Sequence, residues 1–231
     1  MKYKNIEDFF KKNKQAIIFS KFRKGESLKI ADYLYLLKKF FSEELLEFFF
    51  YNFPTSIGIL LRYHYLKFRL KKCEENIIFG KNIEIYNPAD IEVKKFSWID
   101  NYVVLDARFG FINIGSRVHI APNCRIAGGG GVEIGDYVGI SENVKIFSHS
   151  EIIQKGKKMS GPMVDEKDKG YKSKKIVIKN DAFIGTGSII LPGVTVGEGS
   201  VIGANSVVRK DLEPWTIYAG NPLRLVGKRP K

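Results

Sequence analysis

Cysteine and histidine are scarce in this chain of 231 residues, which contains two cysteines and three histidines. Cys73 and Cys124 stand far apart and form no CxxC pair, so neither a disulfide framework nor a zinc knuckle is indicated. No window of 18 uninterrupted apolar residues occurs, which argues against a bilayer-spanning helix. The first residues are charged and lack an apolar h-region, so we expect no signal peptide and a cytoplasmic protein.

Negative charge is in the minority, with 25 acidic against 38 basic residues and a net charge of +13. The surplus lies in three segments: residues 1–76 (16 basic, 9 acidic), 151–179 (nine and four) and 209–231 (six and two). A chain this basic attracts anionic partners, but charge alone does not choose between nucleic acid, membrane and phosphorylated small molecules. No nucleic-acid-binding motif is recognisable, so we expect no nucleic acid partner.

A six-residue repeat dominates the stretch from Ile178 to Leu212. Its aliphatic positions are Ile178, Ile184, Ile190, Val196, Ile202 and Val208. Neither a helix, with 3.6 residues per turn, nor an isolated strand, with a period of two, produces a strict period of six. The pattern predicts a solenoid of short parallel strands, three to a coil, with the periodic aliphatic residue pointing inward.

The repeat defines the expected domain organisation. It is faint over residues 77–93, clear from Ile114 onward, and interrupted by the glycine run 128–131 and by the segment 151–177. We therefore expect a helical extension at 1–76, a solenoid at 77–213 with an inserted loop at 151–177, and a basic tail at 214–231. The fold class is mainly β, with an N-terminal α-helical extension. Loops as long as 151–177 are usually functional or disordered.

The extension carries a dense aromatic stripe. We expect two short helices before residue 42 and a third helix that begins with Ser42 as its N-cap. Such a stripe suits a cap over the open end of a solenoid or a contact between subunits, which we favour. It also suits a basic amphipathic surface on an anionic membrane, which would place the protein at the inner membrane face. The sequence does not separate these roles.

His149 stands where the regular repeat gives way to the inserted loop. An imidazole with a pKa near 6.5 can take a proton from a hydroxyl at neutral pH. The residues alone leave two interpretations of it open, a general base and an ordinary loop histidine. His64 falls in a basic helical stretch, and His119 is expected on a solvated coil face.

The run from His149 through IGTGSIILPGVTVGEGSVIGANSVVRKDL to AGNPLRLV resembles the hexapeptide-repeat acyltransferases, above all O-acetyltransferases of sugars. The resemblance covers about residues 77–226. It implies a left-handed parallel β-helix that assembles as a homotrimer and holds acetyl-CoA in a groove between neighbouring coils. The stretches FPTSIGILLRYHYLKFRLKK and IIFGKNIEIYNP are similar to polysaccharide-modifying members. They imply transfer to a hydroxyl of a sugar in a surface polysaccharide or its precursor. The basic segments 151–179 and 209–231 would attract an acceptor glycan that is acidic or lipid-linked.

The resemblance also implies roles for individual residues. His149 matches the general base, and Thr186 matches the position whose backbone N–H faces the thioester carbonyl and steadies the oxyanion. Phe183 stands where an aromatic residue lines the pantetheine channel. Ala204 matches a backbone contact to the pantetheine arm.

Two further positions match the end of the site that holds the nucleotide of CoA. Arg209 and Lys210 fall where many members have Thr-Lys, and an arginine there still favours phosphate. No metal and no covalent acyl-enzyme are required, and neither cysteine has the surroundings of a nucleophile.

The acceptor side departs from the galactoside enzymes. The acceptor-binding Asn of those enzymes is Ala121 here, and Gly128 and Gly129 replace acidic residues. The acceptor pocket is therefore not that of a simple galactoside enzyme. Asp106 is a candidate for acceptor binding or for orienting the histidine, and a turn aspartate is an equally good reading of it.

Three other functions compete with O-acetylation. An N-acetyltransferase acting on an amino sugar nucleotide would use the same base, and a non-catalytic β-helix scaffold at the membrane surface would bind no acetyl-CoA. A γ-class carbonic anhydrase shares the fold but needs three zinc-binding histidines. Only His119 and His149 lie in the solenoid, so we reject that class.

Overall fold

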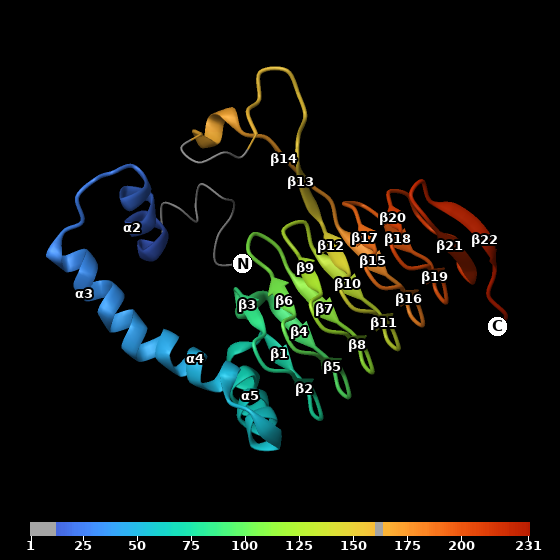
Figure 1. Cartoon of the computed structure of the whole chain (residues 1–231), viewed down its shortest axis with the longest axis horizontal. Helices are drawn as coiled ribbons and strands as arrows, with labels where there is room; N and C mark the ends of the chain where they lie inside the picture. Colours follow the sequence, from blue (N-terminus) through green and yellow to red (C-terminus); the bar gives the residue numbers. More distant parts are fainter. Residues whose placement is uncertain (1–12, 160–163) are drawn as a thin grey trace. The chain divides into compact units, whose positions relative to one another are not determined.

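The computed structural model describes residues 13–159 and 164–231, which fall into two compact units. The larger unit comprises residues 51–150 and 172–231, and the smaller unit comprises the described parts of 1–50 and 151–171. Three sheets, parallel except for one pair of strands at the C-terminal end, build the larger unit into a solenoid of about 7 turns (Figure 1). The expected mainly β, parallel solenoid with an N-terminal helical region is confirmed.

Each coil contributes one short strand to each of three sheets, which we call sheets A, B and C. Sheet A contains β1 (Lys72–Cys73), β4 (Ile91–Val93), β7 (Ile112–Ile114), β10 (Val132–Ile134), β15 (Ile176–Ile178) and β18 (Thr195–Val196). Sheet B contains β2 (Ile78–Phe79), β5 (Trp98–Ile99), β8 (His119–Ile120), β11 (Gly139–Ile140), β16 (Phe183–Ile184), β19 (Val201–Ile202), β21 (Thr216–Ala219) and β22 (Arg224–Lys228). Sheet C contains β3 (Glu84–Tyr86), β6 (Val104–Asp106), β9 (Arg125–Ala127), β12 (Lys145–Phe147), β17 (Ile189–Ile190) and β20 (Val207–Val208).

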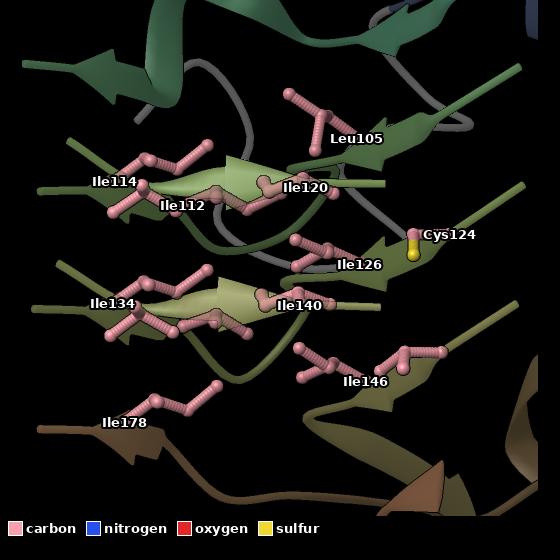
Figure 2. Close-up of a cluster of buried hydrophobic side chains, with 14 of the residues drawn as sticks. Leu105, Ile112, Ile114, Ile120, Cys124, Ile126, Ile134, Ile140, Ile146 and Ile178 are labelled. Carbon is pink, nitrogen blue, oxygen red and sulfur yellow. The ribbon is translucent and has the colours of Figure 1, made fainter. Parts of the chain in front are cut away.

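The hexad aliphatics form the core of this prism. The six positions that the repeat predicts to point inward, from Ile178 to Val208, are all at most 1% exposed. Figure 2 shows the same stacking in earlier coils, where isoleucines of successive strands lie over one another. Burying an aliphatic side chain of this size stabilises the fold by roughly 1.5–3 kcal/mol. The repeat therefore produces one continuous column of apolar contacts.

The corners between sheets need a left-handed backbone, and this explains the recurring asparagines. The B/C corner, which joins a sheet B strand to the next sheet C strand, has a positive φ in each coil. It is occupied by Asn82, Tyr102, Asn123, Asn143, Gly187 and Asn205. Asparagine and glycine tolerate this conformation better than other residues. The C/A corner, from sheet C to the next sheet A strand, carries the glycine run 128–131 and the inserted loop.

Helix α5 (Thr55–Arg69) closes the N-terminal end of the solenoid. Leu66 is fully buried in the same core cluster as the strands, and Leu70 just beyond the helix joins it. The buried Arg62 donates from Nε to the carbonyl of Phe79 (2.9 Å). An open solenoid end would leave apolar side chains and carbonyl groups exposed, so α5 is a structural cap. Residues 51–76 are accordingly grouped with the solenoid, whereas the sequence division placed the boundary after residue 76.

The smaller unit contains α2 (Lys14–Arg23), α3 (Ile30–Lys39), the π-helix η1 (Phe40–Glu44) and α4 (Leu45–Asn52) except for its last two residues, which belong to the larger unit. The expectation that Ser42 caps a new helix is wrong, because the chain passes through η1 without a break and the Ser42 hydroxyl bonds the Lys39 carbonyl (3.4 Å). Helical residues expected before Asn13 lie outside the described residues. Across 13–159 and 164–231, we find no helix with the length and apolarity needed to traverse a bilayer.

The inserted loop and the C-terminal segment complete the chain. Strands β13 (His149–Glu151) and β14 (Tyr171–Ser173) pair at the two ends of the inserted loop, which also contains the 3₁₀ turn η3 (Glu166–Asp168). A second 3₁₀ turn, η2, spans Pro88–Asp90. The last strands, β21 and β22, form an antiparallel hairpin, and Arg229 beyond it forms an ion pair with Asp181 at 3.3 Å.

Candidate functional site

His149 begins β13, immediately after the chain leaves sheet C at the C/A corner. Its ring is half-buried, and Nδ1 is buried with no hydrogen-bond partner among the described residues. The preceding Ser148 is fully buried; its hydroxyl donates to the Ala127 carbonyl (2.8 Å) and accepts from the Gly130 N–H (2.8 Å). These bonds tie the start of the loop to the glycine run of the previous coil. A buried polar atom without a partner is uncommon and marks a candidate functional group.

The electrostatic surroundings of His149 favour the neutral imidazole. Burial lowers its pKa below the usual value, and the positive charges of Arg125 and Arg108 act in the same direction. The carboxylate of Asp106 opposes them but does not reverse the shift. A neutral imidazole can accept a proton, so these surroundings suit a general base near neutral pH.

Gly129 makes room for the imidazole ring. A β-carbon at this position would lie 2.8 Å from Nδ1 of His149 and 3.2 Å from Cγ. Real β-carbons essentially never approach other atoms closer than 3.0 Å. The glycine run that interrupts the repeat therefore has a local function, which is to let the ring lie against the backbone of the preceding coil.

Asp106 lies at the same corner but does not orient the histidine through Nδ1. It ends β6, in register with Ala127 and then Phe147 across sheet C. Its carboxylate, almost wholly buried, accepts from Arg108 Nε (2.9 Å) and Nη2 (2.6 Å) and from Arg125 Nη2 (3.2 Å). Burial alone would raise the pKa of Asp106, but hydrogen bonds from Arg108 and the charges of both arginines hold it below its usual value.

Thr186 and Ala204 occupy a different corner from His149. Both follow sheet B strands, β16 and β19, and precede sheet C strands, so they stack at the B/C corner. A sheet C strand therefore separates them from the C/A corner of the same chain. The Thr186 carbonyl accepts from the Asn205 N–H (2.8 Å), and its own N–H has no acceptor in the described part of the chain.

Phe183 points outward from sheet B and is 45% exposed. It is in register with Gly139 in the preceding coil, where a β-carbon would lie 3.1 Å from the phenyl ring. The ring thus lies over Gly139 of the neighbouring strand, next to the corner that carries Thr186. An exposed aromatic face of this kind can line a channel for an apolar chain.

Arg209 and Lys210 follow β20 and return to the C/A corner, two sheet C strands beyond β12. Adjacent strands lie about 4.8 Å apart, which puts them roughly 10 Å from the level of His149 along the stack. Together with Asn221, Pro222 and Leu223 they line a cavity of about 190 Å³. Two exposed cations beside a small cavity are an arrangement that favours the binding of phosphate groups.

Other candidate groups do not join this site. Burial raises the pKa of the Cys73 and Cys124 thiols to about 11, which makes both poor nucleophiles near neutral pH. The half-exposed His119 pairs with Asp100 (2.9 Å) and stacks beside Trp98 on the outer face of sheet B. Over the described residues, no cluster of His, Cys, Asp and Glu is arranged to hold a metal ion.

Comparison with known proteins gives the family. A profile described as "Bacterial transferase hexapeptide (six repeats)" matches residues 175–210. The Escherichia coli dTDP-4-amino-4,6-dideoxy-D-glucose acyltransferase is 36% identical over 161 residues, 70% of this chain and 83% of that protein. The chain belongs to the hexapeptide-repeat acyltransferases. The resemblance to this family, which the repeat and the AGNPLRLV segment indicate, is confirmed.

Solved structures of this acyltransferase family agree. The N-acyltransferase AntD from Bacillus cereus, in complex with dTDP and 3-hydroxybutyryl-CoA, superposes with a TM-score of 0.67 at 32% identity, covering 73% of this chain and 88% of that chain. A maltose O-acetyltransferase from Clostridium difficile 630 shares the fold, with a TM-score of 0.57 at 24% identity and coverage of 91% and 96%. The Escherichia coli K12 galactoside O-acetyltransferase is 35% identical over 127 residues, and the chain spans 56% of its length. An acyl-CoA-dependent acyltransferase is thereby supported.

The structure groups the sequence-predicted residues of this acyltransferase in two places. His149, Asp106, Arg209 and Lys210 share the C/A corner, whereas Thr186 and Ala204 share the B/C corner. Two residues beside the histidine escaped the sequence analysis, Arg108 and Arg125. Their only signal is spacing: Arg108 follows Asp106 by two residues, and Arg125 lies one coil later.

Proposed function

We propose that this acyltransferase transfers an acetyl group from acetyl-CoA to a hydroxyl of a sugar in a surface polysaccharide or its precursor. The observation that carries the proposal is His149, a half-buried imidazole whose pKa is lowered in a chain of this family. A hydroxyl is a weak nucleophile unless a base removes its proton during attack. His149 would supply that base.

The chain's own groups suit a direct transfer. His149 takes the proton of the attacking hydroxyl, and the imidazolium then returns a proton to the departing CoA thiolate. The Thr186 N–H, which has no acceptor among the described residues, is available for the oxyanion that forms on the thioester carbonyl. General-base assistance is typically worth about 10²–10⁴-fold, and alignment of the two substrates would supply the remainder.

The two-corner arrangement supports a homotrimer as the active form. His149 and Thr186 belong to opposite ends of a sheet C strand, so one chain does not bring both to the same thioester. Pairing the C/A corner of one copy with the B/C corner of the next would complete the site. In a closed ring of three copies each interface would then hold one complete site.

The residues available for acetyl-CoA fit its parts. Arg209 and Lys210 would hold phosphates beside their small cavity, and Phe183 and the backbone at Ala204 would line the pantetheine arm. Bound acetyl-CoA would supply the activated acyl group. The described residues used here are neutral or cationic, as the phosphates of such a ligand require.

N-acylation of an amino sugar nucleotide is the second candidate. Two similar proteins of at least 30% identity favour it: the Escherichia coli acyltransferase is named for a dTDP-linked amino sugar, and AntD is described as an N-acyltransferase in complex with dTDP. A deprotonated amine attacks a thioester without strong base assistance, so the same site could serve it. The special surroundings of His149 are needed more by a hydroxyl acceptor.

One experiment separates the two reactions and tests the base. Purified protein is given acetyl-CoA with either capsular oligosaccharides or dTDP-4-amino-4,6-dideoxyglucose, and thiol release and product mass are followed. An ester product loses its acetyl group in mild alkali, whereas an amide keeps it. We expect an alkali-labile product and at least a ten-fold lower rate for His149→Ala with acetyl-CoA affinity retained. An alkali-stable product formed only from the amino sugar would overturn the O-acetyl assignment.

A further inference from the structure

A charged cluster on the N-terminal side of His149 affects the pKa of the imidazole but has no binding role in the chemistry described above. We define the arginine clamp as Arg108 and Arg125 together with Asp106, the carboxylate that holds them. The Asp106 side chain is 9% exposed, whereas the guanidinium side chains of Arg108 and Arg125 are 40% and 37% exposed. The anion is therefore inside and the two cations face outward.

The clamp carries a surplus of positive charge. Two guanidinium groups share one carboxylate, and Arg125 contacts it through a single N–H at 3.2 Å. Within the described part of the chain, the other N–H groups of both arginines have no hydrogen-bond acceptor. An arginine side chain has five N–H donors in a planar fork, which matches the oxygens of a phosphate or carboxylate.

The neighbouring residues hold Arg108 in place. Its guanidinium lies over the ring of Tyr86, 4.5 Å from the centroid, and the Tyr86 hydroxyl donates to Glu84 (2.9 Å). Arg108 is thus fixed by a bidentate ion pair on one side and an aromatic ring on another. Preorganised side chains lose little conformational entropy when a ligand binds.

The clamp lies on the opposite side of His149 from the cations assigned to CoA. Asp106 ends β6, two sheet C strands before β12, whereas Arg209 and Lys210 follow β20, two strands after it. Each step is about 4.8 Å, so both groups are within the length of a sugar phosphate or a short glycan from the imidazole. The histidine therefore stands between the Asp106–Arg108 pair and the Arg209–Lys210 pair along one corner, and Arg125 reaches Asp106 from the start of β9.

We propose that Arg108 and Arg125 bind an oxyanion of the acceptor and thereby orient its reacting group toward His149. The ligand would be the phosphate of an activated sugar or the carboxylate of an acidic sugar, and in both cases the recognised chemistry is a negatively charged group of paired oxygens. The inference rests on the proposed function for the identity of His149. It adds that neutral sugars are poor acceptors.

Calorimetric titration of the whole 231-residue chain, saturated with CoA so that the donor site is filled, tests the clamp directly. One arm compares dTDP with thymidine, and the other compares glucuronate with methyl glucoside. We expect one oxyanion to bind at least ten-fold more tightly than its neutral partner, and Arg125→Gln to weaken that binding by about 10-fold or more. Arg125→Lys, which keeps the charge without the fork, should fall between the two.

Arg125 is the residue to change because Asp106 keeps its bidentate bond to Arg108 when Arg125 is lost. Arg117→Gln is the matched control: it removes the same charge from a different corner, where the guanidinium lies over the rings of Phe96 and Tyr137. It should leave oxyanion binding unchanged.

The outcome is independent of acetyl transfer. Wild-type affinity for both oxyanions in Arg125→Gln, or no oxyanion binding by the wild type in either arm, would overturn the proposal. Equal losses in Arg117→Gln would point to bulk charge and also overturn it. If instead dTDP or glucuronate binds as expected while no acetyl-CoA turnover is found with any acceptor, the proposed function fails and the oxyanion site stands.

Discussion

Gly129 and His149 are in direct contact between two neighbouring coils, and a β-carbon on Gly129 would lie 2.8 Å from Nδ1 of the imidazole. Gly131 has a left-handed φ of +89 and Gly129 is not among the positive-φ residues, so a left-handed backbone is no obstacle to alanine there, and the three atoms nearest to an added β-carbon all belong to the histidine. The ring must therefore move if any side chain is introduced at this position. A substitution at Gly129 is therefore the most direct way to change the position of the proposed base.

Gly129→Ala should displace the imidazole by several tenths of an ångström while the fold persists. We expect kcat to fall by about 10- to 100-fold, because misplacement by 1 Å can cost about 100-fold. The thermal midpoint should change little. Gly227→Ala is the matched control, since a β-carbon there meets nothing within 4 Å. Full activity in Gly129→Ala would show that the observed ring position is not the catalytic one.

The pH dependence of kcat/KM should report the lowered pKa of His149. Because burial, Arg125 and Arg108 disfavour the imidazolium while Asp106 favours it, the acidic limb should have its midpoint below the ordinary value near 6.5. Arg125→Gln removes a positive charge, which stabilises the imidazolium and raises the pKa. The limb should therefore move to higher pH in that variant, and a shift to lower pH would contradict this account.

Thr186→Pro removes the N–H proposed for the oxyanion together with a side chain that makes no hydrogen bond to the described residues. Gly187 follows it with φ +71, as in a type II turn, and such turns accept proline at the preceding position. Pro122 occupies the equivalent position two coils earlier, where the next residue, Asn123, has a φ of +62. We expect kcat to fall by about 10²–10³-fold with an unchanged thermal midpoint. Glu142→Pro, at the same corner one coil earlier, should keep its activity.

Mixed assemblies test whether the site is shared between copies. Neither His149→Ala nor Thr186→Pro should be active alone, but co-expression should restore activity when one copy supplies the histidine and the next supplies the N–H. Equal random mixing in a three-fold ring gives about one complete site in four. Activity no higher than that of the separate variants would place both groups in a single chain.

The double substitution Arg209→Ala with Lys210→Ala should lower the affinity for acetyl-CoA. The KM for acetyl-CoA should rise more than that for the acceptor, and high salt should reproduce part of the change, because the phosphates are attracted electrostatically. Initial-rate kinetics at two salt concentrations measure both effects. An unchanged KM for acetyl-CoA would remove these residues from the site.

The helices of residues 30–52 suit a role at a membrane surface. Leu37, Phe41 and Phe48 are each more than half exposed, and basic side chains stand at Lys38 and Lys39. We expect the protein to float with anionic vesicles and to be released by salt, because the attraction of basic amphipathic helices to such lipids is screened. Phe41→Glu with Phe48→Glu should abolish flotation.

The control for vesicle binding is Phe68→Glu, on α5, where the ring is 87% exposed. It should float as the wild type does. If the double variant still floats, or if salt does not release the protein, the aromatic stripe does not bind the membrane. A contact between protein chains would then be its role.

The sequence by itself determined the solenoid. With a strict six-residue period, Ile178, Ile184 and Ile190 take the same position relative to the core of a three-sided coil. All three therefore point inward. The glycine run and the inserted loop were likewise readable as departures from that period. His149 was conspicuous for the same reason, since it stands where the repeat stops.

Tertiary structure decided what surrounds the histidine. Gly129 lies about twenty residues from His149, and Asp106 and Arg125 come from two different coils, so no local pattern links them. The separation of Thr186 from His149 by a strand of sheet C also depends on which corner each turn occupies. Contacts across stacked coils are set by register between strands, and the period that fixes the core leaves the outward side chains free.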